Sequence, residues 1–418
     1  MALAIEQNNK TTLFSVLSVP VIVAALGYFV DVYDMLLFGI VRIPSLKALG
    51  LSDIEISKEG ASILNWQMTG LLFGGFLWGT LGDKKGRLSV LFGSIITYSI
   101  ANIACGFVHE PYTYKIWRFI AGLGLAGELG AGITLVSESL PKKLRPFGTS
   151  LVGGIGMLGA VAAYFTAELF EWRVAYFVGG GMGIALLILR LGVRESTIFQ
   201  QLKKNSKVQK GNFLSLVNDR GRLKRYLKCI GIGIPFWYII SVLATFSNEF
   251  GKAFHVVEPV VPGLAIMWAY VAISISDIFS GILSYKLKSR KKAVLYLILF
   301  AFVNSFIFLF HGSNSASQMY FLIFLMGIGI GYWALFVTIA AEQFGTNLRS
   351  TAATTVPNMV RGTVVLMTTA YISLKDSTGV VNAGIILGAI CFTLGIYSIL
   401  TISETHDKDM DFLEEIPT

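Results

Sequence analysis

Two aspartates in the first apolar segment of the chain are the residues best suited to proton chemistry. Asp31 and Asp34 lie near the middle of the segment 17–42, with Tyr33 between them. Residues three apart on an α-helix are separated by about 60° and therefore share a face. Two carboxylates in a low-dielectric medium repel each other, so at least one is expected to hold a proton at neutral pH. This pattern predicts a proton-coupling site. Pairing of both carboxylates with arginines is the alternative.

Two further ionisable side chains lie deep in apolar segments. Glu128 is in the middle of 114–138, and Arg361 is inside 350–373. Glu128 is a third candidate for proton coupling, with a purely structural bond as the alternative. Arg361 needs an anionic partner, either Asp277 in a structural ion pair or an anionic substrate, because guanidinium suits carboxylate and phosphate. The pair with Asp277 is slightly favoured, because Asp277 is an acid inside a segment of the same half.

Aromatic and polar residues in these segments are candidates for contact with an organic substrate. Rings provide stacking surfaces and polar side chains provide hydrogen bonds. For the aromatic residues, packing or lipid contact is the alternative. The candidate substrate-binding residues are Tyr33, Arg118, Trp237, Tyr238, Tyr332, Trp333, Asn358 and Arg361.

The composition places these residues in a membrane. Of 418 residues, 54% are hydrophobic and only 14% are charged, with a mean hydropathy of +0.67. Soluble chains carry about 25% charged residues. The composition therefore excludes a soluble enzyme, a disordered protein and a nucleic-acid binder. Three widely spaced cysteines and four isolated histidines form no disulfide framework and no metal site, so we expect no metal.

Twelve apolar segments are long enough to cross a bilayer, and we expect an all-α membrane protein with twelve transmembrane helices. The segments are 17–42, 62–82, 88–108, 114–138, 148–168, 173–192, 227–248, 262–285, 293–311, 317–341, 350–373 and 380–402. An even number places both termini on one side. With the termini in the cytoplasm, 25 of the 34 Lys and Arg residues are cytoplasmic and eight are on the other side. This bias predicts cytoplasmic termini.

A single long polar interruption divides the segments into six and six. It is the basic stretch 193–226, which we interpret as a cytoplasmic linker near anionic lipid, with a regulatory or partner site as the alternative. The expected domains are 1–192 and 227–418. Short motifs also repeat between them: Gly122-Leu-Gly124 resembles Gly327-Ile-Gly329, 205 residues later. The repeat indicates a duplicated six-helix unit, as in many transporters.

The loop after the second segment carries a family resemblance. Its sequence, Gly79-Thr-Leu-Gly82-Asp83-Lys84-Lys85-Gly86-Arg87, resembles the signature loop of the major facilitator superfamily. The resemblance implies that this loop latches the two halves together in the outward-facing state. The implied loop residues are Gly82, Asp83, Gly86 and Arg87, with Glu138 and Arg145 as partners. The corresponding loop of the second half, after Gly281, has lost the aspartate and keeps only basic charge.

The fourth segment, 114–138, resembles particular members of this superfamily. Its Arg118, its Gly-Leu-Ala-Gly-Glu stretch ending at Glu128, and Glu138 with Arg145 resemble the proton symporters of metabolites, organic acids and phosphate. The superfamily fold implies that the first, fourth, seventh and tenth spans line a central cavity. Asp31, Asp34 and Glu128 would then face one space.

We therefore expect a monomeric secondary transporter in a cell membrane, and a bacterial inner membrane in particular. It would import a small polar metabolite such as an organic acid together with protons. It would not be an enzyme, and a proton gradient would replace any cofactor. A proton-driven exporter of a siderophore or drug is the first alternative. A non-transporting receptor is the second, and the three carboxylates at mid-depth of the spans count against it.

Overall fold

The computed structural model describes residues 18–140, 145–192, 213–345 and 347–406, with 408, 412 and 414; the remaining residues lie outside the described part. The described residues of the first half form helices α2 (Val19–Ala48), α3 (Asp53–Lys85), α4 (Arg87–Cys105), α5 (Pro111–Leu125), α6 (Glu128–Ser139), α7 (Arg145–Met157), α8 (Gly159–Leu169) and α9 (Trp172–Leu189), then η1 (Arg190–Gly192). Those of the second half form α11 (Leu214–Val217), α12 (Arg220–Tyr238), η2 (Ile239–Ala244), α13 (Ser247–Ala253), α14 (Pro262–Leu287), α15 (Arg290–His311), α16 (Ala316–Ile330), α17 (Trp333–Gln343), α18 (Arg349–Thr378) and α19 (Val380–Thr401).

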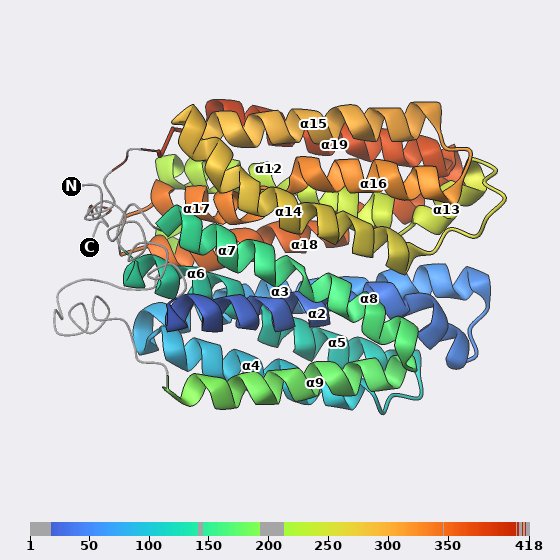
Figure 1. Ribbon diagram of the computed structural model, residues 1–418, viewed down its shortest axis with the longest axis horizontal. Helices are drawn as coiled ribbons and strands as arrows, with labels where there is room; N and C mark the ends of the chain where they lie inside the picture. The colour runs from blue at the N-terminus through green and yellow to red at the C-terminus, as the bar shows by residue number, and fades with distance from the viewer. Residues whose placement is uncertain are drawn as a thin grey trace, which may run out of the picture.

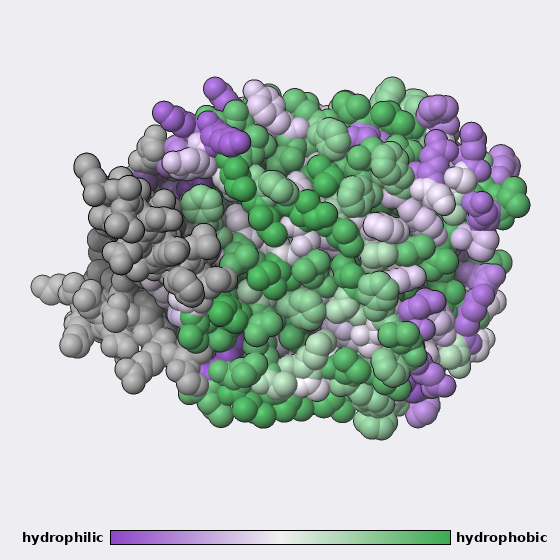
Figure 2. Space-filling model, viewed as in Figure 1, coloured by the Kyte–Doolittle hydropathy of each residue, from purple (hydrophilic) through white to green (hydrophobic). Residues whose placement is uncertain are grey.

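Long apolar helices account for nearly all of this architecture. Ten of the described helices, counting interrupted ones as single rods, are long and apolar enough to cross a membrane. The helices α3 and α18 have 33 and 30 residues and run alongside them (Figure 1). The rods correspond in order to the twelve predicted spans. Figure 2 shows apolar side chains over the middle of the molecule and hydrophilic ones towards its ends, as expected of a protein embedded in a bilayer.

Local sequence signals set where the helices begin and end. Ser52 and Glu55 form a capping box at the start of α3. Gly86 separates α3 from α4 with a φ of 107°, a conformation that glycine adopts without strain. Proline stands in the first turn of α5 and α14, where its missing N–H has no intrahelical acceptor. The signature loop is therefore a sharp turn at Gly86.

Several predicted spans are interrupted. The span 114–138 is divided between α5 and α6, and the span 317–341 between α16 and α17. The two interruptions are equivalent. The bounds of α5 and α16 differ by 205 residues at both ends, and so do the first residues of α6 and α17. This offset equals that of the glycine motifs, and it supports a duplicated unit.

The two halves meet along two seams. The helix α3 packs against α18, while α7 and α8 pack against α14. Glycines permit the close approach: a Cβ at Gly130 would lie 2.2 Å from Thr354, and one at Gly75 would lie 2.8 Å from Asn358. Both described chain ends lie at one end of the molecule, here called the termini end (Figure 1). The cytoplasmic location of that end, the domain boundaries and the basic linker stay predictions, and residues 193–212 lie outside the described part.

Candidate functional site

The side chains of Asp31 and Arg361, both predicted site residues, face each other in the interior of the protein. Arg361 Nη2 lies 3.7 Å from Asp31 Oδ2, and both side chains are at most 1% exposed. Asp31 comes from α2 of the first half and Arg361 from α18 of the second. Neither oxygen of Asp31 accepts a hydrogen bond from a described residue, and Arg361 Nε and Nη2 donate none. The pair is therefore electrostatic, with unused hydrogen-bonding capacity on both sides.

Asn358 connects this pair to the interruption in the fourth span. Its Oδ1 accepts a hydrogen bond of 3.1 Å from Arg361 Nη1. Its Nδ2 donates to the carbonyl of Ala126, at 2.9 Å, between α5 and α6. A carbonyl at a helix end has no intrahelical partner, and here a side chain from the other half satisfies it. Asn358 thus orients Arg361 and joins the two halves.

Aromatic rings form a wall beside Arg361. The Trp333 ring lies 6.0 Å from the Arg361 guanidinium carbon and 4.5 Å from the Phe236 ring. Trp237 lies 6.3 Å from Trp333, and Tyr270 lies 6.4 Å from Phe236. The indole nitrogens of Trp237 and Trp333 and the hydroxyl of Tyr270 are buried and bond no described residue. The wall therefore offers stacking surfaces together with free donors, close to a guanidinium.

The span that carries Trp237 changes its winding beside this wall. The π-helix η2 begins at Ile239, directly after the predicted aromatic residues. Thr245 donates its hydroxyl to the carbonyl of Ile240, five residues earlier, which matches that winding. Such segments are often found at functional sites.

Asp34 has a different environment from Asp31. Arg118 Nη1 donates to Asp34 Oδ1 at 2.8 Å, and Arg118 Nη2 donates to the Asp34 carbonyl at 2.8 Å. Asn102 accepts a third bond from the same guanidinium, at 3.1 Å. Both charged side chains are fully buried. Asp34 and Arg118 thus form an ion pair within the first half, which is the structural alternative that the sequence left open.

Glu128 is also paired within the first half. Arg190 donates to both of its oxygens, at 3.0 and 2.8 Å, and both side chains are about 1% exposed. Ser94 adds a hydrogen bond of 3.3 Å. The sequence analysis counted Arg190 only as one of the cytoplasmic basic residues and did not predict this ion pair. Its side chain is buried because its position at the end of α9 brings it to the start of α6.

The expected pairing of Arg361 with Asp277 is also wrong. Asp277 is fully buried in α14, and both its oxygens face the backbone amide of Ala334, at 3.0 and 3.3 Å. The interruption before α17 leaves that amide without a helical acceptor, and Asp277 takes the place of one. Arg361 faces Asp31 instead.

The hydroxyls of the three predicted tyrosines bond backbone carbonyls. Tyr33 donates to Ala175 at 2.8 Å, Tyr238 to Gly384 at 2.7 Å and Tyr332 to Ile232 at 2.9 Å. Each acceptor lies in the same half as its tyrosine. These hydroxyls are therefore engaged in packing the helices, and a substrate role for these tyrosines stays a prediction.

The signature loop lies at the termini end. The structure places Gly82 in α3 and Gly86 at the turn. The predicted latch side chains lie outside the described part of the structure, so the latch stays a prediction. They are Asp83, Arg87, Glu138 and Arg145.

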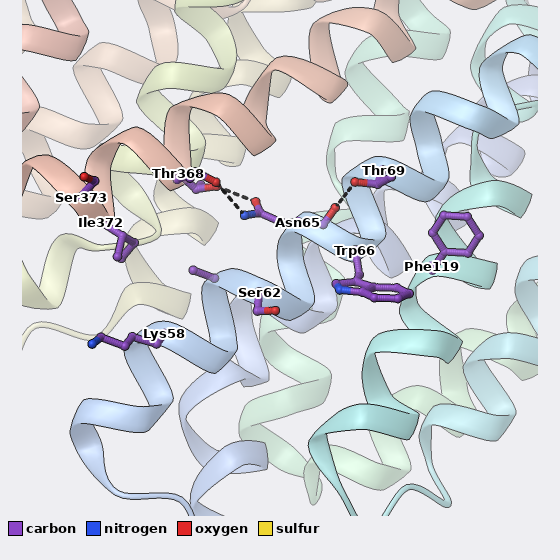
Figure 3. A pocket seen from close by; sticks show the side chains of 11 residues that line it. Lys58, Ser62, Asn65, Trp66, Thr69, Phe119, Thr368, Ile372 and Ser373 are labelled. Carbon is purple, nitrogen blue, oxygen red and sulfur yellow. Dashed lines mark hydrogen bonds between the residues drawn. The ribbon is translucent and has the colours of Figure 1, made fainter.

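A lateral pocket of about 690 Å³ lies between α3 and α18, beside Phe119 of α5 (Figure 3). Asn65 of α3 crosses it to Thr368 of α18, which donates to the Asn65 carbonyl oxygen Oδ1 at 2.6 Å. Trp66 forms part of its wall. None of the central residues described above lines it. The pocket is therefore a lateral groove along the seam rather than the site itself.

Sequence reasoning missed three features of the site. Arg190 was hidden because it adjoins a long basic stretch. Tyr270 gave no signal, since a single tyrosine in an apolar segment is ordinary. Phe236 was not among the predicted site residues, because its contact with Trp333 depends on the packing of two distant spans.

Comparison with known proteins identifies the class. The family model described as Major Facilitator Superfamily matches residues 24–364, and the chain belongs to that family. A gentisate transporter of Corynebacterium glutamicum is 23% identical over 96% of this chain and 92% of its own length. A sialic acid transporter of Escherichia coli is 29% identical over 78% of this chain and 79% of its own. The solved proton:xylose symporter XylE superposes with a TM-score of 0.69 at 16% identity, over 96% and 98% of the two chains, which shows the fold.

Membership of this family confirms the general predictions about the fold, the membrane location and the class of protein. The chain is a multi-pass membrane protein with the major facilitator fold. It is a secondary transporter of a small solute and not an enzyme. The expected resemblance to metabolite transporters is confirmed.

Proposed function

We propose that this protein imports a small organic anion together with a proton, and that Asp31 and Arg361 are the coupled pair. The observation that carries the proposal is the 3.7 Å approach of these two side chains across the halves, with unused hydrogen-bonding atoms on both. Alternating access moves one half against the other. A pair that spans the halves is placed to respond to that movement.

Competition for Arg361 provides the coupling. An ionised Asp31 holds the guanidinium by charge. A proton on Asp31 removes that negative charge and leaves Arg361 for a carboxylate, which guanidinium binds through two parallel N–H donors. When the proton leaves, Asp31 competes again and the anion is released. Substrate and proton therefore bind together.

The aromatic wall indicates the shape of the anion. Trp333, Trp237 and Phe236 offer flat apolar surfaces next to Arg361, and the indole nitrogens offer donors. A flat carboxylate would stack on the rings while its charge meets the guanidinium. The relatives described as gentisate and sialic acid transporters support a carboxylate, because both substrates are carboxylic acids, and of the two only gentisate is flat.

Uptake into proteoliposomes tests the proposal. The medium outside the vesicles is made more acidic than the lumen, so that the proton gradient points inward. Uptake of radiolabelled gentisate, benzoate and sialic acid is then compared with uptake of xylose, a neutral solute. We expect gradient-driven accumulation of at least one carboxylate and none of xylose. Accumulation of xylose alone, or export of the carboxylates under the same gradient, would contradict the proposal.

A further inference from the structure

The interruption of the tenth span breaks the regular backbone hydrogen bonding of the helix inside the membrane. The helix α16 ends at Ile330 and α17 begins at Trp333, with Gly331 and Tyr332 between them. The last carbonyls of one helix and the first amides of the next lose their regular α-helical partners, and here local bonds from Gly331 N–H to the Ile328 carbonyl, at 3.3 Å, and from Tyr332 N–H to the Ile330 carbonyl, at 2.8 Å, replace only part of them. In a bilayer such groups must be satisfied by the protein. The interruption therefore needs bonding partners from a neighbouring helix.

Two adjacent residues of α14 provide those partners. Ser276 Oγ donates to the carbonyl of Ile328 at 2.7 Å, and Asp277 accepts from the amide of Ala334 at 3.0 Å. A Cβ at Gly331 would lie 2.3 Å from the Ser276 side chain, so glycine is required there. One residue thus bonds the end of α16 and the next bonds the start of α17. We propose that Ser276 and Asp277 are positioning residues, a clasp that fixes this interruption and so sets the place of Trp333 in the aromatic wall.

The clasp also touches the first half. A Cβ at Gly153 of α7 would lie 2.3 Å from Asp277 Oδ2, so the two are in close contact. Three residues before the aspartate, Ser274 Oγ donates to the carbonyl of Gly154 at 2.6 Å. The helix α14 therefore bonds the seam with α7 and the interruption of the tenth span within one turn. Movement along the seam is transmitted to the segment that carries Trp333.

The equivalent interruption in the first half, between α5 and α6, shows which of these contacts are particular to the second half. Trp78 of α3 donates to the carbonyl of Leu123 at 2.6 Å, and Leu123 lies 205 residues before Ile328. Both interruptions thus receive a donor from a neighbouring helix at the same position. At the start of α6, however, Glu128 is bonded to Arg190, whereas α17 receives its carboxylate from α14. The first interruption is linked to a seam through Asn358, which bonds the Ala126 carbonyl, whereas in the second a carboxylate bonds the first amides of the helix.

Asp277 acts in this arrangement as a hydrogen-bond acceptor. Among the described residues it has no ion pair, and its side-chain oxygens face the Ala334 amide. An asparagine can accept the same bond through its amide oxygen, but it cannot carry a proton between sides. Asp277→Asn therefore separates positioning from proton transfer.

Hydrogen–deuterium exchange on the purified full-length protein tests the clasp without any substrate. In Asp277→Ala and in Ser276→Ala, we expect amides of the peptide 331–337 to exchange roughly tenfold faster than in the wild type. Asp277→Asn should stay near the wild type. Ser280→Ala is the matched control, because Ser280 lies one turn further along α14 and, among the residues that the structure describes, its hydroxyl bonds only the carbonyl of Asp277. Unchanged exchange in both Ser276→Ala and Asp277→Ala would overturn the clasp, and Ser276→Ala suffices if the other variant does not fold.

Transport kinetics test the consequence, which rests on the proposed function because Trp333 is taken as part of the substrate site. With gentisate as the probe, Ser276→Ala should raise KM roughly fivefold and leave the maximal rate per folded protein near that of the wild type. Asp277→Asn should keep both values. Loss of gradient-driven uptake in Asp277→Asn, with normal exchange, would assign proton transfer to Asp277 and overturn the proposal. If no carboxylate is transported at all, the exchange result still decides the clasp.

Discussion

The guanidinium of Arg361 and the carboxylate of Asp31 lie 3.7 Å apart although 330 residues of sequence separate them. Each of the other central acids of the first half has a closer bond to an arginine of its own half. The Asp31 pair alone among these three crosses the seam. Its geometry combines weak bonding with deep burial, which suits a charge that must change partners in each transport cycle.

Asn substitutions should therefore affect the two aspartates of α2 differently. Asp31→Asn is expected to abolish accumulation against a gradient, because asparagine cannot bind the coupled proton. Substrate exchange without a gradient should persist, because Arg361 remains to bind the anion. Asp34→Asn leaves Arg118 buried without its counterion, which costs about 3–5 kcal/mol of folding free energy. We expect a lower melting temperature for Asp34→Asn, with accumulation retained in the folded fraction. Full accumulation in Asp31→Asn would refute its assignment.

Arg361→Gln tests the anion site. A hydrogen bond to a charged group contributes about 1.5–3 kcal/mol, so substrate affinity should fall by roughly 10- to 150-fold. Added substrate should raise the melting temperature of the wild type but not that of the variant, because stabilisation by a ligand follows its affinity. The control is Arg118→Gln, which removes a guanidinium that donates three hydrogen bonds and should lower stability much more. Equal substrate stabilisation of Arg361→Gln and the wild type would contradict the role.

The sequence predicted the position of the spans because hydropathy and helix length are local properties. It also singled out Asp31, Glu128 and Arg361, because a charge in an apolar segment is conspicuous. It did not predict their partners. Whether Arg361 faces Asp31 or Asp277 depends on how α18 is rotated against α2 and α14, and no local pattern records that rotation.

The helix interruptions were missed for a related reason. The glycine-rich segment around Gly127 fits both a smooth helix and a broken one. What favours the break is the set of partners for the freed backbone groups, namely Asn358 for Ala126 and Asp277 for Ala334. Those partners come from distant spans.

A cluster at the end opposite the termini is expected to hold that end closed. Lys375 of α18 bonds Glu249 at 2.8 Å and donates to Ser57 of α3 at 3.0 Å, and Ser57 donates to Glu249 at 3.0 Å. A hydrogen bond contributes about 0.5–1.5 kcal/mol, so Ser57→Ala should shift the open-to-closed ratio roughly 2- to 12-fold.

Distances between spin labels at the exposed positions 53 and 376 report that shift, since the positions lie on α3 and α18. We expect a larger population of long distances in Ser57→Ala. Thr69→Ala is the control, because Thr69 lies on the same helix and, within the described part of the chain, its hydroxyl bonds only the backbone carbonyl of Asn65. An unchanged distance distribution in Ser57→Ala would show that this cluster does not contribute to closure.

Substitutions in the ion pair of Glu128 and Arg190 test whether Glu128 is a structural residue or a second proton site. Each single substitution to glutamine leaves a buried charge uncompensated and should cost about 3–5 kcal/mol. Gly27→Ala should disturb the same pair, because a Cβ there would lie 1.9 Å from Arg190 Nη2. The double variant Glu128→Gln, Arg190→Gln removes both charges, so we expect it to recover much of the lost stability and to restore gradient-driven accumulation. Melting temperature and uptake are measured on the same preparations. A double variant that recovers its stability but accumulates nothing would assign proton coupling to Glu128 as well as to Asp31.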